Sequence, residues 1–141
     1  MKSFLHKAVA IPAVYDLSQW LAGASISRKI ILEEYASLPP AGPSLDVGGG
    51  TGLSRPLLPE QWSYCCLDPD PQKLEGLRAK FPRDQCVEAS GCDIPLPDDS
   101  FDLCLMNAVS HHLTDDELQR SLAEISRVPR PKRTFVLMDA V

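Results

Sequence analysis

The sequence predicts an α/β domain built on a mostly parallel sheet with helices on both faces. Beyond residue 43, short apolar runs alternate with segments of helical periodicity, an order typical of parallel strands joined by right-handed crossovers. The first apolar run ends in three consecutive glycines, Gly48 to Gly50. A chain of 141 residues, 44% of them hydrophobic, can bury a core as one ordinary domain.

The first 43 residues are expected to form a helical segment ahead of the sheet. Tyr15 and Trp20 belong to an apolar stripe at helical spacing, and a second helix is predicted from Ser27 to Ser37. The segment 38–43 contains three prolines, which remove backbone donors and stop a helix. The sheet is therefore expected to begin directly after this segment.

Five apolar runs are predicted to be strands: Ser44–Val47, Tyr64–Leu67, Gln85–Ala89, Phe101–Met106 and Phe135–Met138. After the second run, Asp70-Pro71 predicts a helix start, because aspartate caps a helix and proline suits its first position. Pro82 is expected to end that helix. Residues 90–100 contain Gly91 and two prolines, so this crossover is predicted to be mostly loop.

Another helix is predicted to begin at Thr114. Glu117 follows three residues later, and this spacing is typical of a capping box, in which each side chain accepts a backbone N–H of the other residue. We expect the helix to bury Leu118, Leu122 and Ile125, which recur at helical spacing. The fifth predicted strand comes after this helix.

Composition argues against several classes of function. The formal net charge of −5 and the lack of a large basic cluster disfavour nucleic-acid binding. A short basic run is interpreted as a solvated helix end and turn: Arg127, Arg130, Lys132 and Arg133. The five cysteines have no CxxC spacing and are expected to be reduced core residues, with neither disulfides nor a metal site. No segment has the length of a membrane span and no good signal-peptide cleavage site follows the N-terminus, so we expect a cytoplasmic protein.

The segment LDVGGGTG (45–52) carries most of the information about function. Glycines after a strand permit a tight turn and close approach of a ligand, and the helix N-terminus expected next offers unpaired N–H groups. A dinucleotide loop has G-x-G-x-x-G spacing, but counting from Gly48 its third place is Leu53. The carboxylate of Asp46 suits a cationic nucleoside such as S-adenosylmethionine and would repel a pyrophosphate. A nicotinamide-dependent oxidoreductase is therefore disfavoured.

Asp68 ends the second predicted strand, twenty positions after Gly48. A carboxylate at that place can accept both hydroxyls of a ribose. Because this holds for either class of cofactor, Asp68 indicates a nucleoside without choosing between them. The alternative is a glycine-rich turn beside a surface aspartate. It is less favoured, because strand, glycine loop, second strand and acid occur in the order that nucleoside binding requires.

These motifs resemble the class I S-adenosylmethionine-dependent methyltransferases, in particular the small-molecule enzymes related to ubiquinone and menaquinone C-methyltransferases. The matching segments are LDVGGGTG (45–52), CLDPDPQKL (66–74), IPLPDDSFDLCLMNAVSHHL (94–113), EISRVPRP (124–131) and FVLMD (135–139). The resemblance implies a Rossmann-like three-layer sandwich with strand order 3-2-1-4-5 over residues 44–141. It also implies that residues 1–43 form a lid over the cofactor, with Tyr15 and Trp20 either in that lid or in the core of its helices.

The resemblance further implies which residues bind S-adenosylmethionine. Those at its methionine end lie in or just beyond the ends of the first and fourth strands: Asp46, Gly48, Gly49, Gly50, Gly52 and Asn107. Asp68 would hold the ribose, and Pro69 would lie beside the adenine. Asp93 would approach the adenine amino group, with Ser90 as the competing candidate, and Ile94 would pack on the ring.

The chain departs from the family pattern in two places. The family's Pro-Gly-Gly turn before the fifth strand is Pro131-Lys132-Arg133 here. The family's sixth and seventh strands are missing, so the fifth strand is expected to leave an open edge that can pair with a second copy. Two functions therefore stay open. One is a methyltransferase for a small-molecule acceptor, and the other is a truncated, non-catalytic cofactor-binding or subunit protein that needs a partner.

Methyl transfer asks the protein mainly for positioning and desolvation, so no catalytic residue is assigned. A general base is needed only where the acceptor must lose a proton. His111 and His112 follow the fourth strand, near the expected ligand side, and one of them can be that base. A cap or a packing contact in the loop is the favoured interpretation of both.

Overall fold

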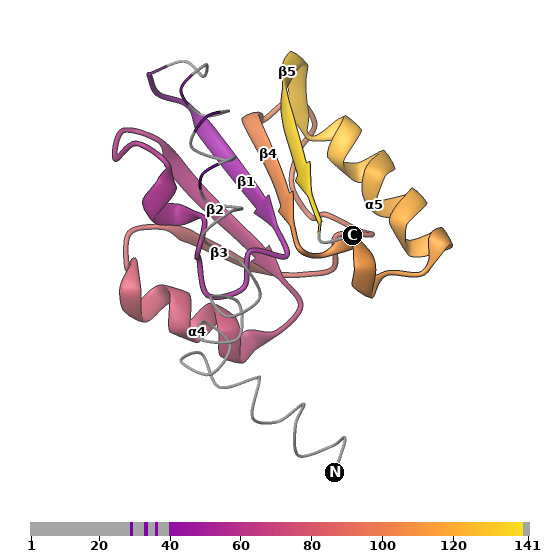
Figure 1. The fold of residues 1–141 in the computed structure, drawn as a ribbon, viewed down its shortest axis with the longest axis horizontal. Coiled ribbons are helices and arrows are strands. Elements are labelled where there is room, and N and C mark those ends of the chain that lie inside the picture. The colour runs from indigo at the N-terminus through magenta and orange to yellow at the C-terminus, as the bar shows by residue number, and fades with distance from the viewer. Residues whose placement is uncertain (1–28, 30–32, 34–35, 37–39, 140–141) are drawn as a thin grey trace.

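The computed structural model describes residues 40–139 together with Lys29, Glu33 and Ala36 (Figure 1). The greater part of the predicted lid, including Tyr15 and Trp20, lies outside the described residues, so the division of the chain at residue 43 stays a prediction. The five strands are β1 Pro43–Val47, β2 Ser63–Asp68, β3 Gln85–Glu88, β4 Phe101–Asn107 and β5 Pro129–Met138. They form one parallel sheet in the order β3-β2-β1-β4-β5, which confirms the predicted topology.

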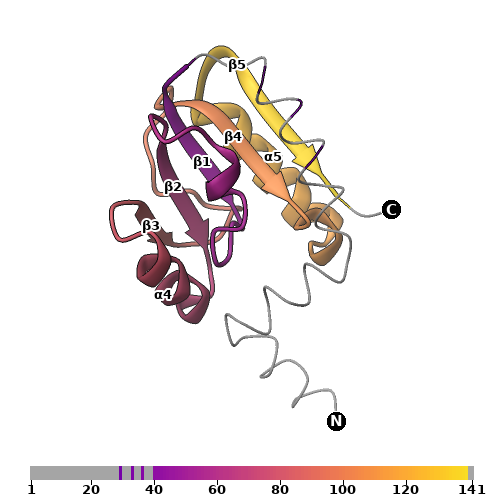
Figure 2. The same cartoon turned by 60° about the vertical axis from the view of Figure 1, so that its left-hand side comes forward.

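Helices cover both faces of this sheet. Alternate residues of β2 point to opposite faces, so that Tyr64 and Cys66 join one core cluster while Cys65 and Leu67 join the other. The helix α4 (Pro71–Lys80) packs Leu74 and Leu77 into the first cluster, and α5 (Asp115–Arg127) packs Ile125 into the second. Figure 2 shows the two helices on different sides of the sheet. The three-layer, Rossmann-like arrangement is thereby confirmed.

Both α-helices begin as the sequence predicts. The Asp70 side chain accepts the N–H of Gln72 at 2.9 Å, and Pro71 occupies the first helical position. Thr114 and Glu117 form the predicted capping box, in which each side chain accepts the other residue's backbone N–H. These starts are set by neighbours in sequence, and such a cap stabilises a helix by about 1 kcal/mol.

The prediction of a helix directly after the glycine loop is wrong. A single 3-10 turn, η1 (Arg55–Leu57), stands there. Pro56 lies inside this turn and Pro59 two residues beyond it, and neither residue has the N–H that an α-helix needs to propagate. The glycine loop is therefore followed by tight turns, and no helix N-terminus faces the cofactor side of the sheet at this point.

The predicted burial of Leu122 is also wrong, because this side chain is 39% exposed. The helix α5 instead directs the small side chain of Ser121 inward, where it lies beside Gly91 of the loop that follows β3. Ile125, one turn further on, shares that buried face. Since successive helical residues are about 100° apart, the orientation that buries Ser121 turns Leu122 toward the surface.

The strand β5 begins earlier than the apolar run 135–138 predicts. Phe101 pairs with Pro129 and Leu103 pairs with Thr134, so four residues of β5 stand opposite Asp102 alone. These four residues bulge, with φ of 62° at Lys132. The basic run, for which the sequence predicts a helix end and a turn, is thus partly a bulge in a strand. Two of its arginines pair with Asp102: Arg130 at 2.8 Å and Arg133 at 3.2 Å.

All five cysteines are free, as the sequence predicts. Burial raises the pKa of Cys65 and of Cys104 to about 12, so neither thiol ionises near neutral pH. Within residues 40–139 and the three described positions before them, no helix is long and apolar enough to cross a membrane.

The outer edge of β5 gives the first testable prediction. Among the described residues, β4 is its sheet neighbour and the other edge is open, while Phe135 and Leu137 are 37% and 46% exposed. An apolar open strand tends to pair with another strand, and a second copy of this chain offers the same edge. We expect concentration-dependent dimers in light scattering, and Leu137→Lys should shift them to monomers.

The exposed Leu53, which follows β1 and belongs to no strand, provides the matched control. Leu53→Lys removes an apolar side chain of similar exposure and should leave the monomer–dimer equilibrium unchanged. A wild-type chain that stays monomeric over the whole concentration range contradicts the predicted pairing.

Candidate cofactor site

The candidate site lies where the carboxyl ends of β1, β2 and β4 meet at one edge of the sheet. Parallel strands place their carboxyl ends together, and ligands of open α/β sheets bind at this edge. The loop that follows β1 contains three glycines with positive φ, namely Gly48 at 73°, Gly50 at 58° and Gly52 at 81°. Such φ values favour glycine, because a side chain strains the backbone there.

The glycine loop packs closely on its surroundings at Gly48 and Gly49, where a side chain would collide with neighbouring atoms. A Cβ on Gly48 would stand 2.5 Å from Cγ2 of Val109, which lies in the segment after β4. A Cβ on Gly49 would stand 2.8 Å from Oδ2 of Asp46 and from the sulfur of Cys66. The loop is therefore held against two neighbouring strands and against the segment that contains Val109.

Asp68 joins the glycine loop to the end of β2. Its Oδ2 accepts the N–H of Gly50 at 3.0 Å, and its Oδ1 accepts the N–H of Asp70 at 2.9 Å. Burial raises the pKa of this carboxyl, and the Asp70 N–H and the charge of Lys73 act in the opposite direction. Each carboxylate oxygen has two lone pairs, so both oxygens can accept a further donor. Asp68 therefore fits a ligand that brings hydroxyl donors, as a ribose does.

Asp46 lies beneath the loop and not on its surface. The side chain is 1% exposed, and its Oδ2 accepts the hydroxyl of Tyr64 at 2.6 Å. Burial raises the pKa of Asp46 to about 6, against hydrogen bonds from Tyr64 and Ser54 that lower it. The Asp46 carboxyl packs against the buried side of the loop at Gly49, and its charge depends on pH near neutrality.

The raised pKa of Asp46 predicts how stability changes with pH. Below its ordinary pKa of 3.8 this carboxyl is protonated in both states, so the shift has no cost. Between pH 3.8 and about 6 the unfolded chain loses the proton first, so folding is weakened by up to roughly 3 kcal/mol, and above pH 6 the loss is complete. Asp46→Asn stays neutral and still accepts from Tyr64, so it should not show this loss.

Urea unfolding at pH 4 and pH 7 measures this effect. The free energy of unfolding of the wild type, taken relative to Asp46→Asn, should fall between the two pH values by up to roughly 3 kcal/mol. If the free energies of unfolding of the wild type and of Asp46→Asn differ by the same amount at both pH values, Asp46 has the same pKa in the folded and the unfolded chain.

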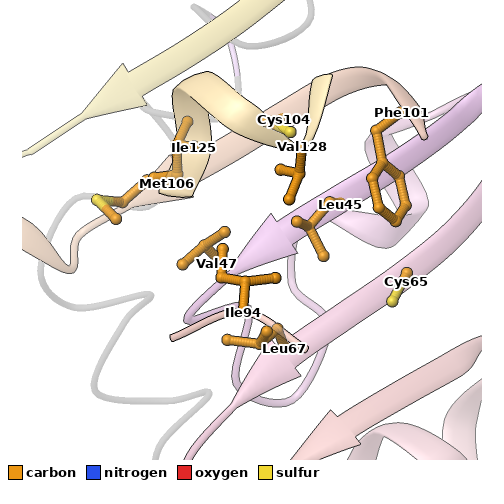
Figure 3. Packing of buried hydrophobic residues seen from close by; sticks show 10 residues of the cluster. All are labelled: Leu45, Val47, Cys65, Leu67, Ile94, Phe101, Cys104, Met106, Ile125 and Val128. Atoms are coloured by element: carbon orange, nitrogen blue, oxygen red, sulfur yellow. The ribbon is translucent and has the colours of Figure 1, made fainter. Parts of the chain in front are cut away.

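Of the residues implied for the adenine side, two are exposed and one is buried. Pro69 and Asp93 are exposed, and the Asp93 N–H donates to the carbonyl of Ser90 at 3.2 Å. Ile94 is 3% exposed and packs in the core between Val47 and Leu67 (Figure 3), so its side chain is not at the surface where a ring would lie.

At the methionine side, Asn107 is the last residue of β4 and is partly buried. Two residues further on, Val109 lies against Gly48. The predicted residues of the first, second and fourth strands are thus brought to one edge of the sheet. Sequence reasoning missed Val109, because nothing in the chain near it indicates a contact with the glycine loop.

A cavity of about 410 Å³ lies elsewhere, at the amino ends of the strands, between Ser63, Arg83 and Phe101. None of the residues implied for the cofactor lines it. The candidate site is therefore chosen by its chemistry, namely the glycine loop and the carboxylate that the loop contacts. The described residues contain no group of histidine, cysteine and acidic side chains arranged to hold a metal ion.

Comparison with known proteins agrees with this site. The family model described as a methyltransferase domain matches residues 45–137. An uncharacterized methyltransferase of Mycobacterium sp. (strain JLS) is 35% identical over 98 residues, which are 69% of this chain and 38% of that protein. An uncharacterized methyltransferase-like protein of Schizosaccharomyces pombe is 35% identical over 89 residues, which are 62% of this chain and 34% of that protein. The chain thus spans less than two-fifths of the length of these curated relatives.

Solved structures share the fold. The YcgJ protein from Bacillus subtilis has a TM-score of 0.73 at 21% identity, over 82% of this chain and 50% of that one. Phosphoethanolamine N-methyltransferase 1 from Haemonchus contortus, solved with phosphoethanolamine and S-adenosylhomocysteine, has a TM-score of 0.65 at 18% identity, over 76% of this chain and 24% of that one. The family model covers well over half of the sequence, including at least part of every strand of the sheet. This chain therefore belongs to the methyltransferase domain family.

Proposed function

We propose that this chain binds S-adenosylmethionine at the carboxyl edge of its sheet and transfers the methyl group to a small-molecule acceptor. The observation that carries the proposal is the hydrogen bond between Asp68 and Gly50. It sets a carboxylate beside a glycine loop in which Gly48 and Gly49 have no room for a Cβ. The carboxylate suits the ribose hydroxyls of the cofactor, and the close-packed loop suits its methionine part. The likeness to quinone-biosynthesis methyltransferases is the reason to expect a small acceptor.

The cofactor supplies an activated methyl group, so this chain mainly has to bind, orient and exclude water. Asp68 would hold the sugar, and Asn107 and the loop would approach the methionine end. The alternative of a non-catalytic binding protein is not favoured, because the methyltransferase model matches the sheet through β5. We also propose a cytoplasmic location, which the five free cysteines support.

Calorimetric titration tests the first half of the proposal. We expect saturable binding of S-adenosylmethionine and S-adenosylhomocysteine, and no competition by NAD. Binding of NAD in preference to either ligand, or no heat with any of them, would overturn it.

Turnover tests the second half. The chain is incubated with S-adenosylmethionine carrying a labelled methyl group and a panel of phenols, amines, thiols and carboxylic acids. Label transfer to a member of the panel is the expected result. Tight cofactor binding without transfer to any acceptor class would instead support the non-catalytic alternative.

A further inference from the structure

A histidine and an aspartate that lie far apart in the sequence meet at the candidate site. Nδ1 of His111 lies 2.5 Å from Oδ1 of Asp139, and the His111 backbone N–H donates to Oδ2 of the same carboxyl at 2.9 Å. The hydroxyl of Ser110 also donates to Oδ2. His111 belongs to the 3-10 turn η2 (Ser110–His112), which follows β4, and Asp139 is the first residue beyond β5. The pair thus bridges the ends of two adjacent strands.

This bridge fixes which nitrogen of His111 can take up a proton. A neutral imidazole carries one N–H, and the carboxylate of Asp139 favours that N–H at Nδ1. Nε2 then keeps its lone pair and can act as a base, and the carboxylate stabilises the imidazolium that results. The hydrogen bonds from the Ser110 hydroxyl and the His111 N–H to Asp139 cap the turn η2, but the contact with the ring is not needed for capping.

The pair lies on the cofactor side of the sheet. Val109, which begins the turn containing His111, packs against Gly48 of the glycine loop. The backbone of Ala108 donates to the carbonyl of Met138 at 2.8 Å, which holds the ends of β4 and β5 together. His111 therefore lies at the carboxyl edge of the sheet, in the turn that packs against the glycine loop.

We propose that His111, oriented by Asp139, is the general base for an acceptor with a phenolic or enolic hydroxyl. The inference rests on the proposed function. As the acceptor oxygen, or the ring carbon conjugated to it, forms a bond to the methyl carbon, the carbon–sulfur bond breaks and its electron pair goes to sulfur. The proton that the acceptor loses moves to Nε2 of His111. The products are the methylated acceptor, S-adenosylhomocysteine and an imidazolium paired with Asp139.

A nitrogen NMR measurement on the full chain tests the orienting role without any turnover. At high pH, neutral His111 should carry its proton on Nδ1, and Asp139→Asn should move it to Nε2. The amide of this variant keeps an oxygen for the cap but offers an N–H donor to Nδ1, which favours the other tautomer. A wild-type His111 that carries its proton on Nε2 would overturn the proposal.

Turnover of a phenol panel tests the role of the base. We expect His111→Gln to lose about 100-fold in rate and Asp139→Asn at least about tenfold, with the affinity for S-adenosylmethionine unchanged. The loss in His111→Gln should shrink as the pH rises, because the phenol then ionises without a base. The matched control is His112→Gln. Its ring centroid lies 3.9 Å from that of His111, and this variant should stay within about threefold of the wild type.

Two results would overturn the inference and leave the proposed function intact. One is a His111→Gln chain that methylates phenols at the wild-type rate. The other is a wild-type chain that methylates thiols or carboxylic acids, which need no base once ionised, but no phenol. Failure of the proposed function is different, since the wild type would then bind no S-adenosylmethionine or methylate no acceptor at all.

Discussion

Replacing Asp68 with alanine is expected to weaken the binding of S-adenosylmethionine by about 100-fold or more. Two ribose hydroxyls donating to a carboxylate contribute about 1.5 kcal/mol or more each, because hydrogen bonds to charged groups are the stronger kind. The sum of about 3 kcal/mol corresponds to about two orders of magnitude in Kd. Calorimetric titration of the variant with S-adenosylmethionine measures this loss.

The same substitution also affects the loop. Without the Asp68 carboxylate, the buried N–H of Gly50 loses its acceptor, and such a group costs about 1–3 kcal/mol of stability. Asp68→Asn separates the two effects, because its amide oxygen can keep the bond to Gly50 while the charge is lost. We expect the asparagine variant to fold like the wild type and still bind the cofactor clearly more weakly.

Asp84 provides a control at the opposite edge of the sheet. It precedes β3 and pairs with Arg55 at 2.7 Å, so Asp84→Ala also removes a largely buried carboxylate. This control should lose stability and keep the affinity for the cofactor. If Asp68→Ala also keeps the wild-type affinity in a folded chain, Asp68 does not belong to the binding site.

The parts of the fold that sequence predicts best are set by residues close together in the chain. The caps at Asp70 and Thr114 need only partners two or three residues away, and both form as expected. The glycine loop and the acid at the end of β2 are recognisable because β1 and β2 are consecutive in the chain and also neighbours in the sheet. Strand order itself followed from the family resemblance.

The errors arise where distant contacts decide the outcome. The early start of β5 depends on a bulge opposite Asp102, and the apolar run 135–138 carries no sign of it. The exposure of Leu122 depends on how α5 is rotated over Gly91. The missing helix after the glycine loop is a different case, because Pro56 and Pro59 oppose a helix through the local sequence alone.

The candidate site was predictable in its location but not in its contacts. Sequence order places Gly50 and Asp68 at one edge, whereas the hydrogen bond between them appears only in the structure. The pair of His111 and Asp139 is separated by 28 positions, and no motif in the chain connects them. The burial of Ile94 follows from the packing of a loop over the sheet, which periodicity does not predict.

Gly48→Ala is expected to lower the free energy of unfolding by about 3 kcal/mol and to weaken cofactor binding. The φ of 73° at this position is a left-handed conformation that costs other residues about 1–2 kcal/mol. The added Cβ would also stand 2.5 Å from Cγ2 of Val109, and such overpacking typically costs about 1–3 kcal/mol. Urea unfolding measures the stability, and calorimetry measures the affinity.

A double variant separates these two causes. Val109→Ala removes the methyl groups that the new Cβ meets, so Gly48→Ala should cost less in that background than in the wild type, by about 1 kcal/mol or more. The remaining cost is the strain of the positive φ, which no neighbour can relieve. Fully additive costs would mean that the loop moves away from Val109 without penalty. The glycine loop would then not be held by the segment after β4, and the close packing on which the cofactor site depends would be wrong.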